Sequence, residues 1–251
     1  MPFTGVVFFQ SVDNATLLNV DALAGVPYRT SGDDAFVPPT FNQVILAHAF
    51  GDTTLAREQF EAPSMVQKGA YEIKPIDLAL EPTSAFPVTK MLDNPIVLDE
   101  GEAINWKGSN TGAAADRHIG ALWLADGAIS PVKDPNEITI RATAAITAVA
   151  DTWTNGQITL DRDLKVGEYA LLGARIEGAT LSLARFIPSQ SNARPMVLCY
   201  DTVADVEDTI FRHGNLGVWC TFKHDSPPAI EIFCSAADTA QVLTLDIAKV
   251  G

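Results

Sequence analysis

The chain has 251 residues, is 47% hydrophobic and carries a formal net charge of −14 at pH 7, from 17 basic and 31 acidic residues. No window approaches the ~18 uninterrupted apolar residues of a membrane-spanning helix, and no cluster of Lys and Arg is longer than a pair. Because this charge balance repels phosphate backbones, we expect no direct nucleic-acid binding.

The N-terminal half predicts β-strands. Its first ten residues, Met1–Gln10, lack a basic leader and have the composition of a strand, so we expect no signal peptide. Runs rich in Val, Ile, Thr and aromatic residues, bounded by Gly, Pro, Asn and Asp, are typical of an all-β sandwich. In this half the runs are Thr4–Val12, Asn42–Phe50, Ala70–Ile76, Asn94–Val97, Ala103–Trp106 and His118–Leu124.

The C-terminal half continues the pattern, with one candidate helix at Val203–Ile210. Cys199, Cys220 and Cys234 lie in apolar strand-like segments, which favours core residues in a protein made in reducing cytoplasm. The predicted strands are Glu137–Ile146, Gln157–Leu160, Tyr169–Ala174, Ser182–Ile187, Met196–Tyr200, Gly217–Phe222, Ala229–Cys234 and Val242–Ala248.

The two halves echo each other in sequence. Residues 43–60 align without gaps against residues 169–186 at an offset of 126. In a second echo, residues 114–116 and 121–126 correspond to residues 236–238 and 242–247, at an offset near 122. Two units of this size are each large enough for a core of their own. The echo therefore predicts a duplicated domain.

The domain prediction is a first unit over 1–126, a linker over 127–136 that holds Pro131 and Pro135, and a second unit over 137–251. The first unit carries two long irregular loops, 20–40 and 76–93, of the kind that is usually functional or interfacial. Eight short antiparallel strands per half, in two facing sheets, are the size of a jelly roll. The predicted fold is all-β, with two tandem eight-stranded antiparallel jelly-roll sandwiches.

Catalytic and cofactor patterns are weak. A metal-binding cupin needs two histidines one residue apart, a carboxylate and a third histidine, whereas His48, His118, His213 and His224 stand alone and favour surface or edge positions. There is no Gly-x-Ser-x-Gly, no Cys-x-x-Cys and no phosphate-binding Gly-x-x-x-x-Gly-Lys. We therefore predict no catalytic residue, no cofactor and no metal.

Among the acidic clusters and the tryptophans, one residue remains a candidate for a functional role. The acidic groups Asp33-Asp34, Asp99-Glu100-Gly101-Glu102 and Asp161 with Asp163 have the character of solvated turns, since calcium requires six to eight oxygen ligands. Three of the four tryptophans fall inside apolar strands and are expected in a core. Trp153 lies in a turn before a strand, and we predict it as a possible interface anchor.

The end of the first half carries a family resemblance. The run Pro95-Ile96-Val97-Leu98-Asp99-Glu100-Gly101-Glu102-Ala103-Ile104-Asn105-Trp106 is followed by Asn110-Thr111-Gly112-Ala113-Ala114 and then by Ile119-Gly120-Ala121-Leu122-Trp123-Leu124. This order of a Gly-Glu turn, an Asn/Thr/Gly turn and a Leu-Trp-Leu strand is similar to the closing strands of a viral capsid jelly roll. The whole chain resembles a small double jelly-roll major capsid protein of tailless icosahedral viruses, such as membrane-containing bacteriophages.

That resemblance implies a structural protein of the virion, made in the host cytoplasm, and no enzyme. Three copies would form a homotrimer, a pseudo-hexagonal capsomer that tiles a shell together with other capsid or penton proteins. The acidic charge favours an internal membrane or a separate protein between shell and genome. Two other functions stay open: a glycan-binding β-sandwich module of a phage fibre or cell surface, and a bicupin-type metalloenzyme.

Overall fold

The structure is a computed structural model that describes residues 3–65, 69–77, 79, 86–112, 114–127, 129–203 and 210–251. Within these ranges it contains twenty strands and two short 3-10 helices, η1 (Pro63–Met65) and η2 (Lys90–Leu92). The prediction of an all-β chain is confirmed. No helix in the described ranges has the length and apolar character that a bilayer crossing demands. The candidate helix over 203–210 falls outside the described residues, apart from its two ends.

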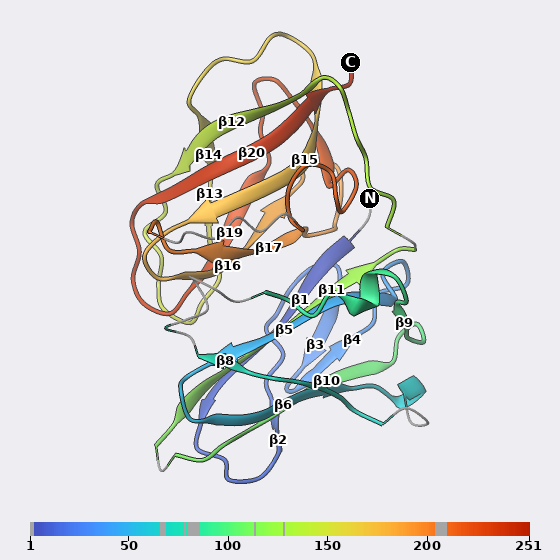
Figure 1. The fold of residues 1–251 in the computed structure, drawn as a ribbon, viewed down its shortest axis with the longest axis vertical. Coiled ribbons are helices and arrows are strands. Elements are labelled where there is room, and N and C mark those ends of the chain that lie inside the picture. Colours follow the sequence, from blue (N-terminus) through green and yellow to red (C-terminus); the bar gives the residue numbers. More distant parts are fainter. Residues whose placement is uncertain are drawn as a thin grey trace. The chain divides into compact units, whose positions relative to one another are not determined.

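The chain divides into two compact units (Figure 1). The N-terminal unit is built from residues between Phe3 and Ala128, and the C-terminal unit is built mainly from Ile129–Gly251. Each unit holds its own set of hydrogen-bonded sheets. The chain therefore folds into two separate β-structures.

Two sheets make up the N-terminal unit. The five-stranded sheet has the order β1 (Phe3–Val12), β11 (Asp116–Ala125), β5 (Gln43–Gly51) and β8 (Ile76–Asp77), with β9 (Ile96–Val97) also on β5. The six-stranded sheet has the order β3 (Arg29–Ser31), β4 (Asp34–Phe36), β10 (Ala103–Asn110), β6 (Leu55–Glu61) and β7 (Tyr71–Ile73), with β2 (Leu18–Val20) also on β10.

The core of the N-terminal unit lies between these two sheets. Phe8 of the first sheet stacks on Trp106 of the second at a centroid distance of 5.9 Å, and Phe60 stacks on the same indole at 6.2 Å. A Cβ atom on Gly120 would lie 2.1 Å from the ring of Trp106. Glycine is therefore required at this position of β11, because any side chain would occupy the space of the indole.

One connected nine-stranded sheet makes up the C-terminal unit. Its order is β13 (Thr154–Gly156), β19 (Ala229–Cys234), β16 (Leu181–Ile187), β17 (Met196–Tyr200), β15 (Glu168–Glu177), β20 (Gln241–Lys249), β12 (Glu137–Ala144) and β14 (Ile158–Leu160), with β18 (Cys220–Lys223) also on β15. On β12, the alternation of exposed Thr139 and Arg141 with buried Ile140 and Ala142 shows one face toward the core and the other toward solvent.

The two units share a pattern of strand pairing. The antiparallel set β1–β11–β5 corresponds to β12–β20–β15, and the antiparallel pair β10–β6 corresponds to β19–β16. The parallel pair β5–β8 corresponds to β15–β17, and the antiparallel pair β5–β9 corresponds to β15–β18. Likewise, β2 pairs with β10 as β13 pairs with β19.

The correspondence extends to an irregularity in the ladder. The register between β6 and β10 passes over Ala56, and the register between β16 and β19 passes over Ser182, which is 126 positions later. In both units the residue that directly follows the second strand of this pair, β10 or β19, makes the same hydrogen bonds. Thr111 donates its backbone N–H and its hydroxyl to the carbonyl of Thr54, and Ser235 donates the same two groups to the carbonyl of Thr180. A shared bulge and a shared side-chain bond indicate one plan used twice.

One strand explains why the first unit has two sheets and the second has one. In the C-terminal unit, β17 pairs with β16 through Met196–Leu198 and with β15 through Cys199 and Tyr200. In the N-terminal unit the same two partnerships belong to separate strands, β7 and β8, which Lys74 and Pro75 divide. Proline lacks the N–H that a continuous ladder requires, so the strand is broken there.

Several details of the prediction need correction. The described strands number eleven and nine, not eight per half, and β5–β8 and β15–β17 are parallel. The segment 20–40, predicted as a loop, contains β3 and β4, and the segment 76–93 contains β8 and η2. The sequence echo at an offset of 122 is also out of register. Ala121 pairs with His48, whereas Leu243 pairs with Ile176 and not with Ala174.

Candidate functional site

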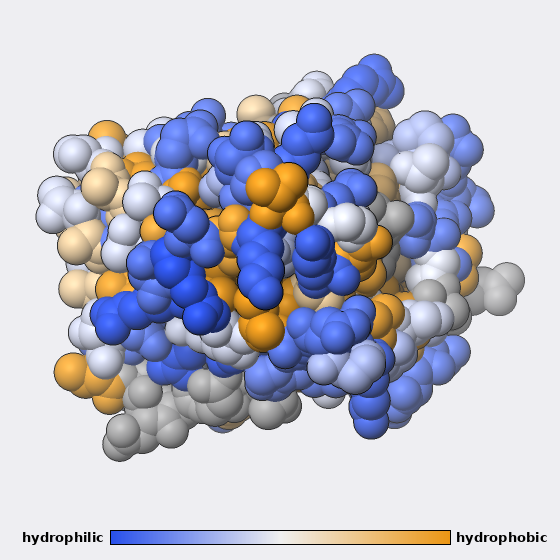
Figure 2. All heavy atoms as spheres, turned by 90° about the horizontal axis from the view of Figure 1, so that it is seen from above, coloured by the Kyte–Doolittle hydropathy of each residue, from blue (hydrophilic) through white to orange (hydrophobic). Residues whose placement is uncertain are grey.

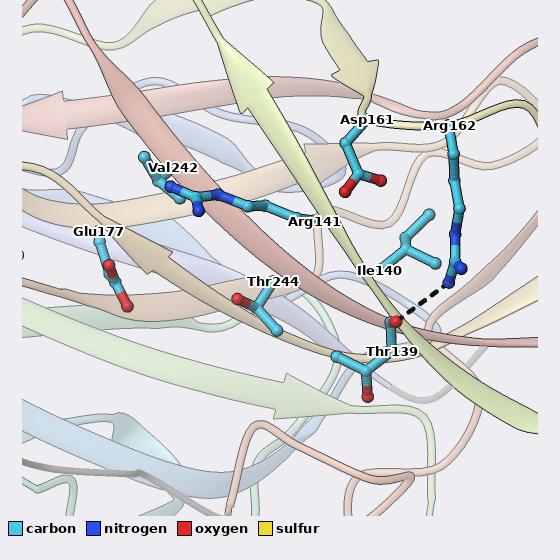
Figure 3. Close-up of a pocket in the computed structure, with 8 residues that line it drawn as sticks. All are labelled: Thr139, Ile140, Arg141, Asp161, Arg162, Glu177, Val242 and Thr244. Atoms are coloured by element: carbon cyan, nitrogen blue, oxygen red, sulfur yellow. Dashed lines mark hydrogen bonds between the residues drawn. The ribbon is translucent and has the colours of Figure 1, made fainter.

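An open groove of about 520 Å³ lies on the C-terminal unit, over β12 and β20 (Figure 3). Its lining is polar and carries charges of both signs. The lining residues are Thr139, Ile140, Arg141, Asp161, Arg162, Glu177, Val242 and Thr244. The alternation of β12 places Thr139 and Arg141 on the solvent face of the sheet, which is why polar side chains gather here.

The charged groups of this groove do not converge on one point. Arg162 donates from Nη2 to the backbone carbonyl of Thr139 at 3.3 Å, while Arg141 extends away from Arg162 toward Val242 (Figure 3). Glu177 accepts a bond from Arg175 Nε at 2.7 Å. None of the eight side chains drawn is aromatic, so these residues supply hydrogen bonds but no ring on which a sugar could stack.

A loop from Phe211 to Gly214 is anchored across a bulge in β15. The register of β15 on β20 passes over Leu172, whose carbonyl accepts a bond from Gly214 N, and Ala174 N donates to the carbonyl of Phe211. A Cβ atom on Gly173 would lie 2.7 Å from the Cα atom of Arg212. The bulge thus frees backbone groups for the loop, and Gly173 lets the loop approach closely.

Under this loop, Asp246 of β20 is fully buried and accepts four hydrogen bonds. Its Oδ2 accepts from Arg212 Nε at 2.6 Å and from His213 N at 2.9 Å. Its Oδ1 accepts from Arg212 Nη2 at 2.9 Å and from Thr139 Oγ1 at 2.9 Å. Burial acts to raise the pKa of Asp246, but the bonds from Arg212, His213 N–H and Thr139, with the charge of Arg212, hold that pKa below its usual value.

Glu137, His213 and Asp246 bring three metal-ligand atoms within 4.8 Å of one another. His213 Nδ1 lies 2.7 Å from Glu137 Oε1 and 3.7 Å from Asp246 Oδ2. Asp246, however, uses its lone pairs on four donors, and the guanidinium of Arg212 already balances its charge. The residues do not fit a cation, and the arrangement is an ion-paired loop anchor.

The histidines are placed differently from their prediction as surface or edge residues. His48 is 2% exposed and His118 is fully buried, so for these two the prediction was wrong. His48 lies on the central strand β5, and burial lowers its pKa to about 4, against a smaller raising effect of a backbone bond with Phe86. His213 lies in a loop and has a side chain that is half exposed.

His118 belongs to a polar cluster inside the core of the N-terminal unit. Its Nδ1 lies 2.6 Å from Glu58 Oε1, and both side chains are fully buried. The indole N–H of Trp106 donates to the other carboxylate oxygen of Glu58. Burial raises the pKa of Glu58, while His118 and Trp106 act in the opposite direction. A Cβ atom on Gly108 would lie 2.3 Å from His118 Nδ1, so glycine makes room for the pair.

This cluster was missed from the sequence because its members are far apart along the chain. Glu58 and His118 are 60 residues apart, and Glu58 stands between the polar residues Arg57 and Gln59, so its sequence neighbours do not mark it as buried. The signal that was present is the pair of glycines at 108 and 120, one in β10 and one in β11. Glycine inside a strand marks a close approach by another group.

Two of the predicted acidic turns, at Asp33-Asp34 and at Glu102, bond to other segments of the N-terminal unit. Asp33 accepts from Asn19 Nδ2, and Asp34 accepts from Asn105 Nδ2 at 2.7 Å. Glu102 accepts from Ser64 N and from Asp99 N, which closes the turn at Gly101. Asp161 lines the groove of Figure 3. These acids are spread over both units, and the bonds of Asp33, Asp34 and Glu102 hold turns and strand edges of the N-terminal unit.

The cysteines and Trp153 are placed as follows. Cys199, Cys220 and Cys234 are buried, as predicted, and burial raises the pKa of Cys220 and of Cys234 to about 12. Trp153, the predicted interface anchor, is half-buried just before β13. Its ring packs against Phe233 at 5.6 Å, and the guanidinium carbon of Arg185 lies 4.1 Å from its centroid.

Comparison with known proteins gives little. No protein-family model and no curated protein matches the chain. A solved structure that matches is the crystal structure of the major capsid protein P2 from bacteriophage PM2, at 11% identity, over 94% of this chain and 98% of that chain. The TM-score is 0.24. At that value the likeness carries no argument about the function of this chain.

Proposed function

We propose that the chain is a structural protein of a viral capsid, built as two tandem jelly-roll sandwiches, with no catalytic activity. The observation that supports this is the repeated pairing of strands, with the same bulge at Ala56 and at Ser182 and the same bond from Thr111 and from Ser235. A chain with two like units presents two similar sets of surfaces. Three such chains can close a ring of six similar units.

In this proposal three copies form a homotrimer, a pseudo-hexagonal capsomer, and capsomers tile an icosahedral shell in the virion. The partners are further copies, other capsid or penton proteins and an internal membrane, while the net charge of −14 disfavours contact with the genome. Figure 2 shows hydrophobic residues emerging among hydrophilic ones on one face of the molecule. Val166, 77% exposed, and Val97, 60% exposed, are examples of aliphatic side chains that an interface would cover.

The test is the assembly state of the purified full chain. Sedimentation velocity across micromolar concentrations should give a trimer, and negative-stain microscopy should show particles with six lobes. A protein that stays monomeric at every concentration tested would contradict the proposal. The same preparation distinguishes the other two functions, because glycan-array binding that Trp153→Ala abolishes would favour a glycan-binding module, and stoichiometric bound iron or manganese would favour a bicupin.

A further inference from the structure

A cluster on the C-terminal unit joins a cation, an aromatic ring and a carboxylate. Arg185 of β16 has a side chain that is only 5% exposed, and its Nε donates to Glu231 of β19. The guanidinium carbon lies 4.1 Å from the ring centroid of Trp153, and Phe233 packs on the indole at 5.6 Å. The guanidinium and the indole are therefore neighbours in one enclosed cluster, held by β16 and β19 and by the turn before β13.

Two donors in this cluster have no acceptor. Arg185 Nη1 and Trp153 Nε1 are both buried, and within the part of the chain that the structure describes neither makes a hydrogen bond. A buried donor without a partner destabilises the folded protein, and more so when the group is charged. Such groups in a native protein call for an explanation, for example a bound ion or water.

The electrostatics of the cluster favour an anion. Burial lowers the pKa of Arg194, Glu231 acts to raise it, and the positive charge of Arg185 lowers it further. Arg194 is therefore within electrostatic reach of both residues, which adds a second guanidinium near the carboxylate of Glu231. A charged acceptor forms stronger bonds with a guanidinium than a neutral one does.

We propose that the Arg185–Trp153 cluster is a binding site for a small oxyanion, a carboxylate or phosphate group, that accepts hydrogen bonds from Arg185 Nη1 and Trp153 Nε1. The oxyanion comes from one of two sources, a free anion in solution or an acidic group of a second copy of this chain. The first source does not depend on the proposed capsid function. The second gives the predicted interface anchor at Trp153 a chemical partner.

The indole N–H resonances of the wild-type protein provide the test. Trp153→Phe assigns the Trp153 signal by its loss from the proton–nitrogen correlation spectrum. Sodium phosphate and sodium acetate are then titrated into dilute wild-type protein at constant ionic strength, kept with sodium chloride. The Trp153 signal should shift and saturate, while the Trp106 signal stays in place, because Trp106 Nε1 already donates to Glu58.

A variant and a dilution series complete the design. Arg185→Lys keeps the positive charge but removes Nη1, so the apparent affinity should fall about tenfold or more; an unchanged affinity would assign the shift to another site and overturn the proposal. Dilution without added oxyanion separates the sources, since a carboxylate from a second copy makes the Trp153 signal depend on protein concentration.

If Trp153 responds to neither anion nor to dilution, water satisfies the two donors and the site does not exist. If Trp153 responds to phosphate or acetate in a protein that sedimentation shows to be monomeric, the site stands while the capsid proposal falls. The two proposals therefore fail under different observations.

Discussion

The two units use corresponding strands but put their polar groups in different places. In the N-terminal unit, Glu58 of β6 lies opposite Gly108 of β10 and points into the core toward His118. The same pairing in the C-terminal unit places Ala184 opposite Ile232, and both of these are buried and apolar. In the C-terminal unit the buried charged residues stand at other positions. Asp246 lies under the loop 211–214, and Arg185 lies beside Trp153.

This contrast shows how one strand plan accommodates two kinds of core. A large polar pair in the first core is matched by glycines at 108 and 120, which leave room for the imidazole and the indole. In the second core the glycine position is filled by Ile232, and the acid position is reduced to Ala184. In both units a large residue faces a small one, while the chemistry of the large residue changes. The first unit should therefore be the more sensitive to loss of a polar partner.

The largest effect is expected from breaking the buried pair of the N-terminal unit. His118→Leu leaves the Glu58 carboxylate buried with only the indole donor, and should destabilise the protein by about 3–5 kcal/mol. Chemical denaturation followed by far-UV circular dichroism measures the loss. Adding Glu58→Leu to His118→Leu should restore much of it, because an apolar pair has no charge to desolvate. His224→Leu, at a partly exposed histidine of the C-terminal unit, is the control and should change stability by less than about 0.5 kcal/mol.

A comparable loss of stability is expected when the pH is lowered, and it should be confined to the N-terminal unit, which contains His48. Because the pKa of His48 is about 4 in the folded protein and 6.5 in the reference state, the unfolded chain takes up the proton first as the pH falls. Stability from neutral His48 is present above pH 6.5 and is lost between pH 6.5 and about 4. The loss is at most about 3 kcal/mol. Hydrogen exchange, corrected for its intrinsic pH dependence, should show β5 and β11 losing protection while β15 and β20 keep theirs.

His48→Gln isolates that contribution from the opposite effect of Glu58. The pKa of Glu58 is raised by burial, so its contribution is fully present below 4.5 and is lost as the pH rises. The wild-type protein carries both effects, whereas the variant keeps only that of Glu58. A pH dependence that is the same in wild type and variant would show that His48 is not buried in its neutral form.

A smaller effect should come from the ion pair of the C-terminal unit. Arg212→Ala removes two of the four donors to Asp246 and should cost about 2 kcal/mol, with a loss of exchange protection in the loop 211–214. Gly173→Ala tests the same docking sterically, since the added Cβ would lie 2.7 Å from Arg212 Cα. Equal protection of this loop in both variants and in wild type would contradict its assignment as an anchor.

The sequence predicts the long strands, but it misses short strands such as β3 and β4 and it does not give the contacts between strands. Alternation in Glu137–Ala144 predicts a strand with one wet face because a period of two is a local property. Pairing partners, such as Glu58 with His118 and Arg185 with Trp153, depend on register, and a slip of one residue moves a side chain to the other face. This is why the echo at an offset of 126 is in register with the bulges of β6 and β16, although residues 55–61 were not predicted as a strand, while the echo at 122 is out of register. It is also why the burial of two histidines, predicted at the surface or an edge, could not be read from the sequence.

The smallest effect is expected at His213, whose side chain is half exposed and lies outside both cores. His213→Ala removes the bond to Glu137 but keeps the bond from the backbone N–H to Asp246, so only the contact of a half-exposed side-chain pair is lost. Such pairs contribute about 0–1 kcal/mol. His213 also adopts a left-handed backbone with φ of 54°, which costs alanine as well as histidine, so the substitution leaves backbone strain in place. His213→Gly relieves that strain and loses the same bond. If the Gly variant is more stable than the wild type by denaturation, the relief of backbone strain outweighs the lost bond to Glu137, and the loop is held by Asp246 and Arg212 and not by the histidine ring.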